Sequence, residues 1–533
     1  MTEDTKARRK YWPHLIWLAL IAVAVGVVYK DLPRSTFFLD DFLHLHLIER
    51  FKSGFEPFIN DVFMGAFFRP AITFFWMLDH LVYGINPTGY YLSNIIYLFI
   101  SSVLLFMLLQ NMTGSYSISG IISALYAVGP VTGIGVMWLS NRFDLIGTLL
   151  FLASTLLFLR YVRFRRPMAY LWSVFLGTLA YFCKEITITL PVILVLASGF
   201  MFLYRAPQTF NFRLIKRLIS LSTPYFTIAV IYMIWRFAVI KSLGGYVGEQ
   251  KEPLTLGYFF FLWNCFGDYL WLIKNFFVFI VLTMLLIVLL VKKNFYASNK
   301  LFFFGILFTV ITAFPLVMIL RYRGVMSYMT PRFFFLPNIG ALIVLASMYD
   351  PRGGRARRAL AGVILALVGV SMALNNYILV HKWMRDKQKL TAKTEQVDQF
   401  MKNKLSAEIK DGIIYTCMYG LDVALDSSIK LMHPEYLSRY YFLNCTGPTQ
   451  SVATNELFQQ YRRFINYPQT FARNPCEYNG LLYGVVDTRP TTIPQQMRSS
   501  ENVAVLHYNK MGDLTSINRN IINERLRTLG ILQ

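Results

Sequence analysis

The stretch YWPHLIWLALIAVAVGVVYKDLPRSTFFLDDFLHLHLIERF, Tyr11–Phe51, joins an apolar run to two adjacent carboxylates, Asp40 and Asp41. A helix that crosses a bilayer needs about 20 apolar residues, and residues 13–30 supply such a segment. Adjacent carboxylates repel each other and bind water strongly. Their place directly after a span therefore marks either the start of a helix or a chemical site, and both interpretations stay open at this point.

The composition is that of a polytopic helical membrane protein. Of 533 residues, 55% are hydrophobic and only 15% are charged; an average soluble protein has about 25% charged residues. The mean hydropathy is +0.45. The net charge of +23 is carried largely by basic residues in short loops between apolar runs. That distribution indicates membrane topology and contact with lipid phosphate, and it argues against nucleic acid as a partner.

Apolar segments recur as far as Val380. They are predicted at 13–30, 69–84, 90–110, 117–137, 143–161, 168–183, 186–204, 219–240, 270–291, 300–320, 333–349 and 358–380. The segment 69–84 is short, begins with Arg69-Pro70 and contains Asp79-His80. These features favour a helix that lies in the membrane interface. The sequence then predicts about 11 transmembrane helices.

Basic residues in the loops support this count. With the N-terminus inside and 69–84 interfacial, basic clusters at 6–10, 160–166, 205–217, 292–300 and 352–358 all face the cytoplasm. Counting 69–84 as a span would place the last four clusters outside. The topology therefore predicts a transmembrane domain over 1–380, with an outer loop at 31–89, and an extracytoplasmic α/β domain over 381–533.

Three cysteines lie in the predicted extracytoplasmic tail. An oxidising compartment permits disulfides. Cys445 and Cys476 are the predicted pair, and Cys417 is the competing partner. Cys183 and Cys265 lie in the apolar half and are interpreted as packing residues.

The same topology gathers polar residues on the outer side of the membrane. They are Asp40-Asp41, Arg142 and Asp144, Lys184-Glu185, and Arg321, Arg323 and Arg332. The three arginines lie on the predicted outer side, whereas the basic clusters of the other loops lie on the cytoplasmic side. This exception to the positive-inside rule indicates an anionic partner such as a lipid phosphate. Each feature also has a structural explanation: a helix cap, an Arg142–Asp144 ion pair, an interfacial Lys184–Glu185 pair and a solvated loop.

These residues resemble the GT-C superfamily of integral-membrane glycosyltransferases. In that superfamily a first span leads to an outer loop that opens with an acidic pair and carries two interfacial helices. The corresponding elements here are Asp40-Asp41, a helix near 42–52 and the segment 69–84. The resemblance predicts the GT-C fold, with two juxtamembrane helices in the first outer loop.

A nearer resemblance is to the transmembrane O-mannosyltransferases that carry tetratricopeptide repeats, and to their bacterial relatives. It rests on FFRPAITFFWMLDHLVYGINPTGYYLSNIIYLF, ALYAVGPVTGIGVMWLSNRFDLIGTLLFL and FCKEITITLP. Gly129 and Gly133 depart from the family pattern, which has a His and a Glu at about these places, and Tyr91 stands where a His is usual. The tail shows no repeat of about 34 residues, so O-mannosylation of protein is not carried over.

The resemblance implies an inverting transfer of a sugar from a polyprenyl-phosphate carrier to a hydroxyl acceptor. Asp40 is predicted to be the general base and Asp41 to orient it, although their roles are interchangeable at this stage. The residues predicted to bind the donor phosphate are Arg142, Lys184, Arg321, Arg323 and Arg332. The predicted supporting residues are Asp144, Glu185, Arg69 and His44.

The implied partners are the lipid-linked donor, an unidentified acceptor and membrane lipids, at a bacterial inner membrane with the site on the periplasmic side. No cofactor is required, although a divalent cation stays open. His44 and His46 lie two residues apart, on different faces of a helix, which disfavours a shared metal site. The alternative functions are a glycan polymerase or ligase, and a transporter of lipid-linked solutes.

Overall fold

A computed structural model describes residues 3–37, 40–51, 67–240, 300–316, 330–347 and 355–400, four strands in the tail, and a few single positions. The chain divides into two units. The first consists of Met1–Ser35 and Phe51–Met384, and the second of Thr36–Arg50 and Arg385–Gln533. The predicted span at 270–291 lies outside the described residues.

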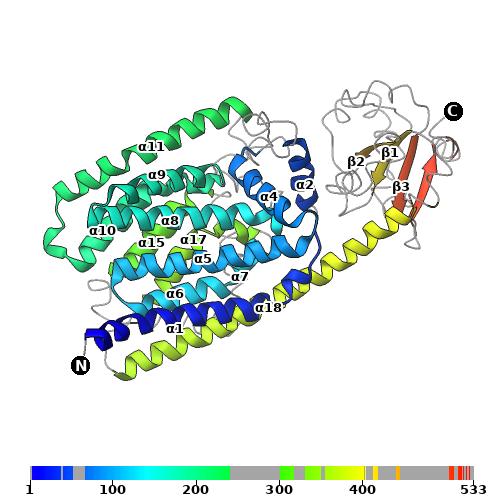
Figure 1. Ribbon diagram of the computed structural model, residues 1–533. Coiled ribbons are helices and arrows are strands. Elements are labelled where there is room, and N and C mark those ends of the chain that lie inside the picture. Colours follow the sequence, from blue (N-terminus) through cyan, green and yellow to red (C-terminus); the bar gives the residue numbers. More distant parts are fainter. Residues whose placement is uncertain are drawn as a thin grey trace. The chain divides into compact units, whose positions relative to one another are not determined.

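The first unit is a bundle of helices (Figure 1). Its helices are α1 (Glu3–Tyr29), η1 (Leu32–Arg34), α4 (Pro70–Tyr83), α5 (Pro87–Thr113), α6 (Tyr116–Val128), α7 (Pro130–Met137), η2 (Leu139–Asn141), α8 (Arg142–Phe164), α9 (Pro167–Tyr181), η3 (Glu185–Thr189), α10 (Leu190–Arg205), η4 (Pro207–Thr209), α11 (Phe212–Ile240), α15 (Lys300–Ala313), η7 (Thr330–Phe334), α17 (Pro337–Ala346) and the first part of α18 (Arg355–Phe400).

The chain is a helical polytopic membrane protein, as predicted. Within the described ranges, six helices are long and apolar enough to cross a membrane, or seven if the bent pair α6 and α7 counts as one span. Helix α4 has 14 residues and is not among them. The interfacial role of 69–84 stays a prediction.

Local sequence signals set the helix ends. Helix α5 begins after Asn86, whose side-chain oxygen accepts the backbone N–H of Thr88 at 3.1 Å, and Pro87 occupies the first helical position. Both are favoured there, because the first N–H groups of a helix have no intrahelical partner. The helix ends at Gly114, whose φ of +74° suits a residue without a side chain.

The bend between α6 and α7 lies at Gly129-Pro130 and measures 49°. Proline removes a backbone donor and frees carbonyl groups in the turn before it. The Asn376 side-chain nitrogen lies 3.1 Å from the Val128 carbonyl oxygen, 3.2 Å from that of Gly129 and 2.8 Å from the Tyr29 hydroxyl. The Asn376 side chain on α18 therefore donates hydrogen bonds to carbonyl groups that the bend leaves without helical partners inside an apolar bundle.

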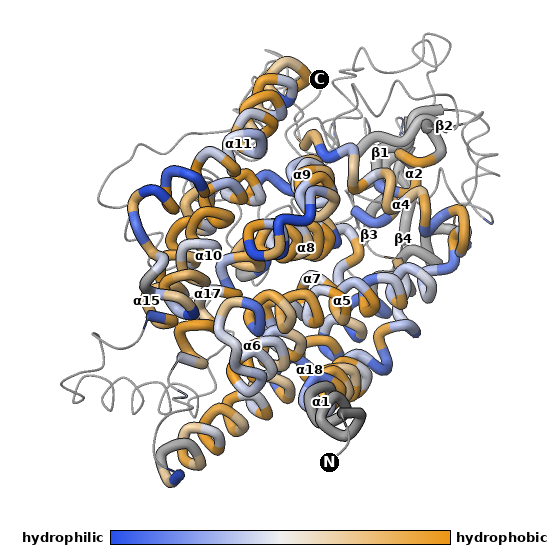
Figure 2. Tube along the Cα trace, turned by 60° about the vertical axis from the view of Figure 1, so that its left-hand side comes forward, coloured by the Kyte–Doolittle hydropathy of each residue, from blue (hydrophilic) through white to orange (hydrophobic). Residues whose placement is uncertain are grey.

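Helix α8 is the most enclosed of the candidate spans, with 72% of its apolar window buried. It packs against α5, α9 and α10, which run beside it in Figure 1. Helices α1 and α11 are largely apolar, as the colouring of Figure 2 shows, and they carry exposed apolar side chains. Trp12 and Ile234 are among the exposed ones. The central position of α8 decides where its first residue, Arg142, lies.

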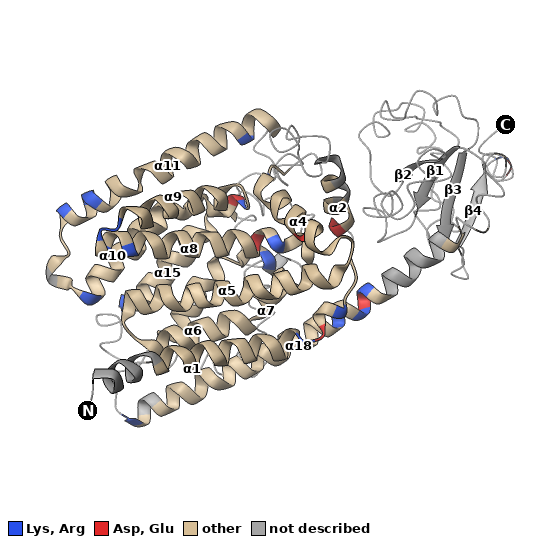
Figure 3. Ribbon diagram, viewed as in Figure 1, with Lys and Arg blue, Asp and Glu red and all other residues tan. Residues whose placement is uncertain are grey.

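Charged residues in the helical unit separate into two kinds. Figure 3 shows basic residues at the C-terminal ends of α8 and α10 and at the N-terminal end of α11. It also shows a group of basic and acidic residues among the helices, where α4 meets α8. The first group agrees with the positive-inside pattern from which the topology was predicted. The second group is buried and forms the candidate site.

The second unit contains α2 (Asp40–Phe51) and the strands β1 (Gly412–Cys417), β2 (Tyr440–Asn444), β3 (Val503–Tyr508) and β4 (Leu514–Asn518). The strand order is β2-β1-β3-β4. β1 is parallel to β2 and β3, with Ile413 opposite Val503, whereas β3 and β4 are antiparallel. The predicted α/β domain over 381–533 stays a prediction as a whole.

Candidate functional site

Arg142 is the centre of the first buried cluster. Its guanidinium donates from Nη1 to Asp79 Oδ2 at 2.7 Å, from Nε to Asn94 Oδ1 at 3.1 Å and from Nη2 to the Tyr90 carbonyl at 3.1 Å. The side chain is 0% exposed. Each of its three nitrogen atoms therefore has a protein acceptor, which a buried arginine requires.

The partners of Arg142 form further hydrogen bonds of their own. Ser93 Oγ donates to Asp79 Oδ1 at 2.8 Å, and Asn94 Nδ2 donates to the Val136 carbonyl at 3.2 Å. The guanidinium also lies over the Trp76 ring, 4.7 Å from its centroid. We call Arg142, Asp79, Tyr90, Ser93 and Asn94 the Arg142 cluster. It is neutral as a whole and ties α4, α5 and α8 together.

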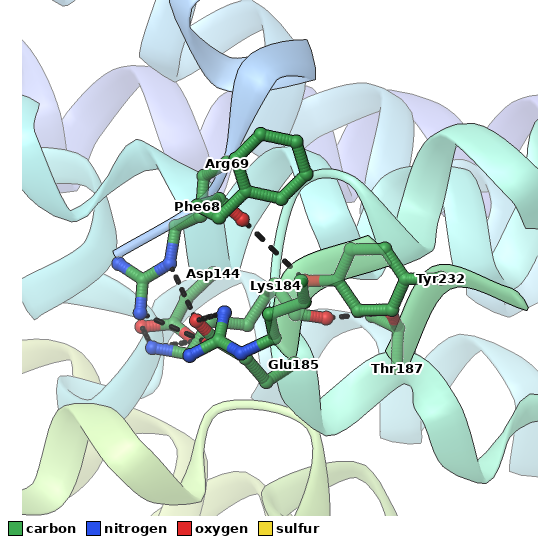
Figure 4. A network of polar contacts seen from close by, with 8 residues as sticks. Phe68, Arg69, Asp144, Lys184, Glu185, Thr187 and Tyr232 are labelled. Atoms are coloured by element: carbon green, nitrogen blue, oxygen red, sulfur yellow. Dashed lines mark hydrogen bonds and ion pairs between the residues drawn. The ribbon is translucent and has the colours of Figure 1, made fainter. Parts of the chain in front are cut away.

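Glu185 is the centre of the second buried cluster (Figure 4). Arg69 donates to both of its oxygens, at 3.1 Å and 2.9 Å, and Arg236 Nη1 donates to Oε1 at 2.9 Å. The Arg236 side chain is only 4% exposed. One carboxylate therefore faces two guanidinium groups, from the segment before α4 and from α11.

Lys184 and Asp144 form an ion pair next to Glu185 and its two arginines. The Lys184 ammonium lies 3.4 Å from Asp144 and 4.1 Å from the centroid of the Phe143 ring, over which Arg69 also lies at 4.1 Å. Lys184 occupies the turn between α9 and η3. Burial lowers the pKa of Lys184 to about 8, although the negative charge of Asp144 opposes the shift.

We call Arg69, Asp144, Lys184, Glu185 and Arg236 the Glu185 cluster. Its three cations and two carboxylates give it a net charge of +1, inside a helical bundle. Arg332 is a further cation near the cluster: it acts electrostatically on both Asp144 and Lys184, and it lies 4.4 Å from the centroid of the Trp138 ring. Buried charges normally occur with compensation, so the excess of positive charge among the described residues of the cluster favours an anionic ligand.

The structure corrects two ion pairs that the sequence offered. Arg142 pairs with Asp79 and not with Asp144, and Lys184 pairs with Asp144 and not with Glu185. Residues two apart on a helix point to different faces, so 142 and 144 reach different neighbours. The predicted support of Lys184 by an acidic residue is present, with Asp144 in place of its sequence neighbour.

An apolar hollow lies on η3 and α11, the elements that also carry Glu185 and Arg236. Its volume is about 380 Å³, and it is lined by Ile188, Phe226, Ala229, Val230, Met233, Ile234 and Phe237. Ile234 and Phe237 lie within two residues of Arg236 in the sequence and are more than half exposed. On this helix the arginine turns into the bundle while its neighbours form an outward apolar surface.

The acidic pair forms the first turn of α2, in the second unit. Asp40 is half-buried, Asp41 is fully buried at 0% exposure and His44 is 6% exposed. Carboxylates are favoured at a helix N-terminus, so the cap explanation stays open beside the catalytic one. The two carboxylates nevertheless differ in access to solvent.

Several predicted residues lie outside the described part of the chain. They are Arg321, Arg323, Cys445 and Cys476. Cys417 is described only as part of β1. The predicted disulfide and two of the predicted donor contacts therefore stay predictions. Among the described residues, no three His, Cys, Asp or Glu side chains gather as a metal site would require.

Arg236 was not among the residues predicted from the sequence. The sequence contained a signal for it, because a lone arginine inside an otherwise apolar span is rare and is often functional. Asp79 was noticed only as evidence that 69–84 is interfacial. Its partner Arg142 lies 63 positions away, a distance that no local pattern bridges.

The chain is similar to known proteins. Human Protein O-mannosyl-transferase TMTC3 is 28% identical over 198 residues, in a match that covers 33% of this chain and 21% of the relative. The chain thus spans about a fifth of that relative's length. This match confirms the predicted resemblance to the O-mannosyltransferases.

Among solved structures, the chain is similar to the Archaeoglobus fulgidus oligosaccharyltransferase, in a crystal structure with a tethered acceptor peptide. It superposes with a TM-score of 0.43 at 12% identity, over 96% of this chain and 74% of that chain. No protein-family model matches the chain.

Proposed function

We propose that this protein is a membrane glycosyltransferase of the GT-C type. It would transfer a sugar with inversion from a polyprenyl-phosphate carrier to a hydroxyl acceptor on the periplasmic side of a bacterial inner membrane. The observation that carries the proposal is the Glu185 cluster, a buried group with a net positive charge among the described residues. The elements η3 and α11, which contribute Glu185 and Arg236, also line an apolar hollow on their outward side. The similarity to an O-mannosyltransferase adds support for the type of reaction.

The two features match the two chemical parts of such a donor. The phosphate is an anion, and arginine binds its oxygens through parallel N–H bonds. The polyprenyl chain is apolar and suits a hollow lined by side chains such as Phe226 and Met233. Arg69, Lys184 and Arg236 are the proposed phosphate contacts, with Arg332, Arg321 and Arg323 as further ones.

Arg142 has a different proposed role. Its three nitrogen atoms already donate to Asp79, Asn94 and the Tyr90 carbonyl. A phosphate would have to displace one of these acceptors and leave it buried without its donor, which costs about 1–3 kcal/mol. We therefore assign Arg142 to the structure that holds α4 against α8.

The reaction, and the role of Asp40 in it, are those that the resemblance to the GT-C transferases implies. The acceptor hydroxyl oxygen attacks the anomeric carbon while the bond from that carbon to the phosphate oxygen breaks, and the electron pair leaves with the polyprenyl phosphate. Asp40 accepts the hydroxyl proton, because a hydroxyl is a weak nucleophile near neutral pH. The cations of the Glu185 cluster stabilise the negative charge that develops on the leaving phosphate.

Mass spectrometry of lipid co-purified with the protein tests the donor. Wild-type protein is expected to retain a sugar-linked polyprenyl phosphate, and Arg236→Met to lose most of it. Arg213→Met is the matched control, because Arg213 is exposed on the same helix. Equal retention by Arg236→Met and the control would argue against the cluster as the phosphate site.

Asp40→Asn tests the base. The change keeps the size of the side chain and removes proton acceptance, so transfer is expected to fall by about 10²- to 10⁴-fold while the donor is retained. Asparagine caps helices about as well as aspartate, so a carboxylate that only caps α2 would tolerate the change. Near-normal transfer by both Asp40→Asn and Asp41→Asn in folded protein would end the proposed mechanism.

A further inference from the structure

A lysine that the sequence analysis did not single out is buried in the unit that contains the acidic pair. Lys387 lies on α18 and is 1% exposed, although lysine is almost never fully buried without a partner. Its ammonium lies 3.4 Å from the carbonyl oxygen of Thr36, and Asp41 is the carboxylate that acts electrostatically on it. Lys387, Thr36 and Asp41 belong to the same unit.

The two carboxylates of the pair have different surroundings. Asp41 is 0% exposed, whereas Asp40 is half-buried. A carboxylate that is removed from water needs a cation or hydrogen-bond donors to stay ionised. Lys387 meets that need for Asp41, and its contact with Thr36 lies on the segment that leads directly into α2. The same ammonium therefore acts on both the backbone before the pair and one member of the pair.

We infer that Lys387 is the positioning residue of the acidic pair: it holds Asp41 as a buried carboxylate and fixes the entry to α2, which leaves Asp40 as the proton acceptor. The inference deepens the proposed function and rests on it for the role of Asp40. It decides between the two aspartates, which the sequence left interchangeable, by their difference in burial and by the buried cation that interacts electrostatically with Asp41.

The position of Lys387 is determined by its helix. Trp383 lies one turn earlier on α18, and its Nε1–H donates to the Met137 carbonyl at 3.1 Å. Residues four apart on a helix share a face, so Trp383 and Lys387 mark one buried side of α18. Lys382 and Asp386, their neighbours in sequence, are exposed. Lys382 therefore provides a matched lysine for the experiment.

A double-mutant cycle on thermal stability tests the pairing without any need for activity. Full-length protein in detergent is compared as wild type, Asp41→Asn, Lys387→Met and the double variant. Each single change removes one charge of the pair and leaves the opposite charge buried, so it is expected to lower the melting temperature by several degrees. The double variant is expected to melt above both singles, and Lys382→Met to melt with the wild type.

The outcome of the cycle is decisive in either direction. Additive losses would overturn the inference, as would failure of the double variant to fold when both singles fail. If both single variants fail to accumulate as folded protein while the double variant accumulates, the pairing is supported. The physical reason is that removing both charges together leaves neither one uncompensated.

Turnover separates positioning from a purely structural role. It is followed as consumption of the native pool of sugar-linked polyprenyl phosphate in membranes that contain each variant. Lys387→Met is expected to lower the rate at least 10-fold, Lys387→Arg to restore most of it, and Lys387→Met in the Asp41→Asn background to add little. Retention of polyprenyl monophosphate as a probe is expected to stay unchanged, because the proposed phosphate site is the Glu185 cluster.

The two hypotheses fail in different ways. A rate that falls equally in Lys387→Met and Lys387→Arg, or a full further loss in the Asp41→Asn background, would overturn the positioning role. No donor consumption by wild-type protein would instead overturn the proposed function, while the stability cycle would still decide whether Lys387 and Asp41 are paired.

Discussion

The Arg142 cluster and the Glu185 cluster are both buried charge networks in the same helical unit, yet their composition differs in one respect. In the Arg142 cluster one cation meets one carboxylate, and the remaining guanidinium nitrogens donate to an amide and a backbone carbonyl. In the Glu185 cluster three cations share two carboxylates. A closed network of the first kind stabilises structure, whereas a network with excess charge is suited to bind an anion.

This difference teaches how to separate structural from functional buried charges. Burial alone does not distinguish the clusters, because Arg142 and Arg236 are both almost completely enclosed. The balance between cations and acceptors does distinguish them. The comparison predicts that changes in the Arg142 cluster affect folding, and that changes in the Glu185 cluster affect donor binding and turnover.

The largest effect is expected for Arg142→Met. The change leaves Asp79 as a buried carboxylate without its cation, which costs about 3–5 kcal/mol when one partner of a buried pair is removed. The amount of monodisperse protein in size-exclusion chromatography should fall sharply. Arg163→Met is the control, since Arg163 is exposed on the same helix. A well-folded Arg142→Met variant that lacks only activity would break the comparison.

Arg236→Met is expected to have the next largest effect, and on turnover. Removing one donor from a group that stabilises transition-state charge typically costs about 10²- to 10³-fold in rate. Glu185 keeps both bonds from Arg69, so the melting temperature should change much less than for Arg142→Met. Melting and donor consumption are measured on the same preparations. A loss of stability as large as that of Arg142→Met would remove the distinction between the clusters.

Lys184 predicts an alkaline limit to activity. With a pKa of about 8, lowered by burial, its ammonium is charged below that pH and neutral above it. Turnover should therefore fall about 10-fold for each pH unit above 8. Lys184→Arg should abolish this alkaline decrease in turnover, because arginine stays protonated. The loss is not unfolding: between about pH 8 and 10.5 the unfolded chain binds more protons, so this group makes folding more favourable as pH rises.

The control for the pH profile is Lys216→Arg, since Lys216 is exposed on α11. Rates are measured from pH 6 to 10 with donor in excess, and folding is monitored at each pH. An unchanged alkaline decrease in turnover in Lys184→Arg would assign the titration to another group. It would also weaken the case that the charge of Lys184 acts on the donor.

The smallest effect is expected for Ser93→Ala. The hydroxyl donates to Asp79 at 2.8 Å, and losing a typical hydrogen bond costs about 1 kcal/mol of stability. Turnover per folded molecule should stay the same, because Ser93 belongs to the closed network. Chemical or thermal unfolding measures the loss of stability, and donor consumption measures turnover per folded molecule. A large fall in turnover with unchanged stability would place the Arg142 cluster in the binding machinery.

Parts of the site were predictable from local sequence. Arg69, Lys184, Asp144 and Glu185 were singled out as polar residues at the ends of apolar segments, and the structure gathers all four. Their pairing was not predictable, and the two pairs suggested by proximity in the chain were wrong. Arg236 and Lys387 were missed, because each needs partners from distant segments before its burial becomes informative.

The sequence by itself determined the helical membrane class and the resemblance to the O-mannosyltransferases. These are local properties: about 20 apolar residues span a bilayer, and a polar residue inside a short segment is visible in a single window. Only the tertiary structure decided which charges share a site. An ion pair depends on which faces of separate helices converge, and that geometry brings Arg142 to Asp79 and Arg236 to Glu185 across many intervening residues. It also sets how many cations face each carboxylate, which is the quantity that separates a structural network from a binding one.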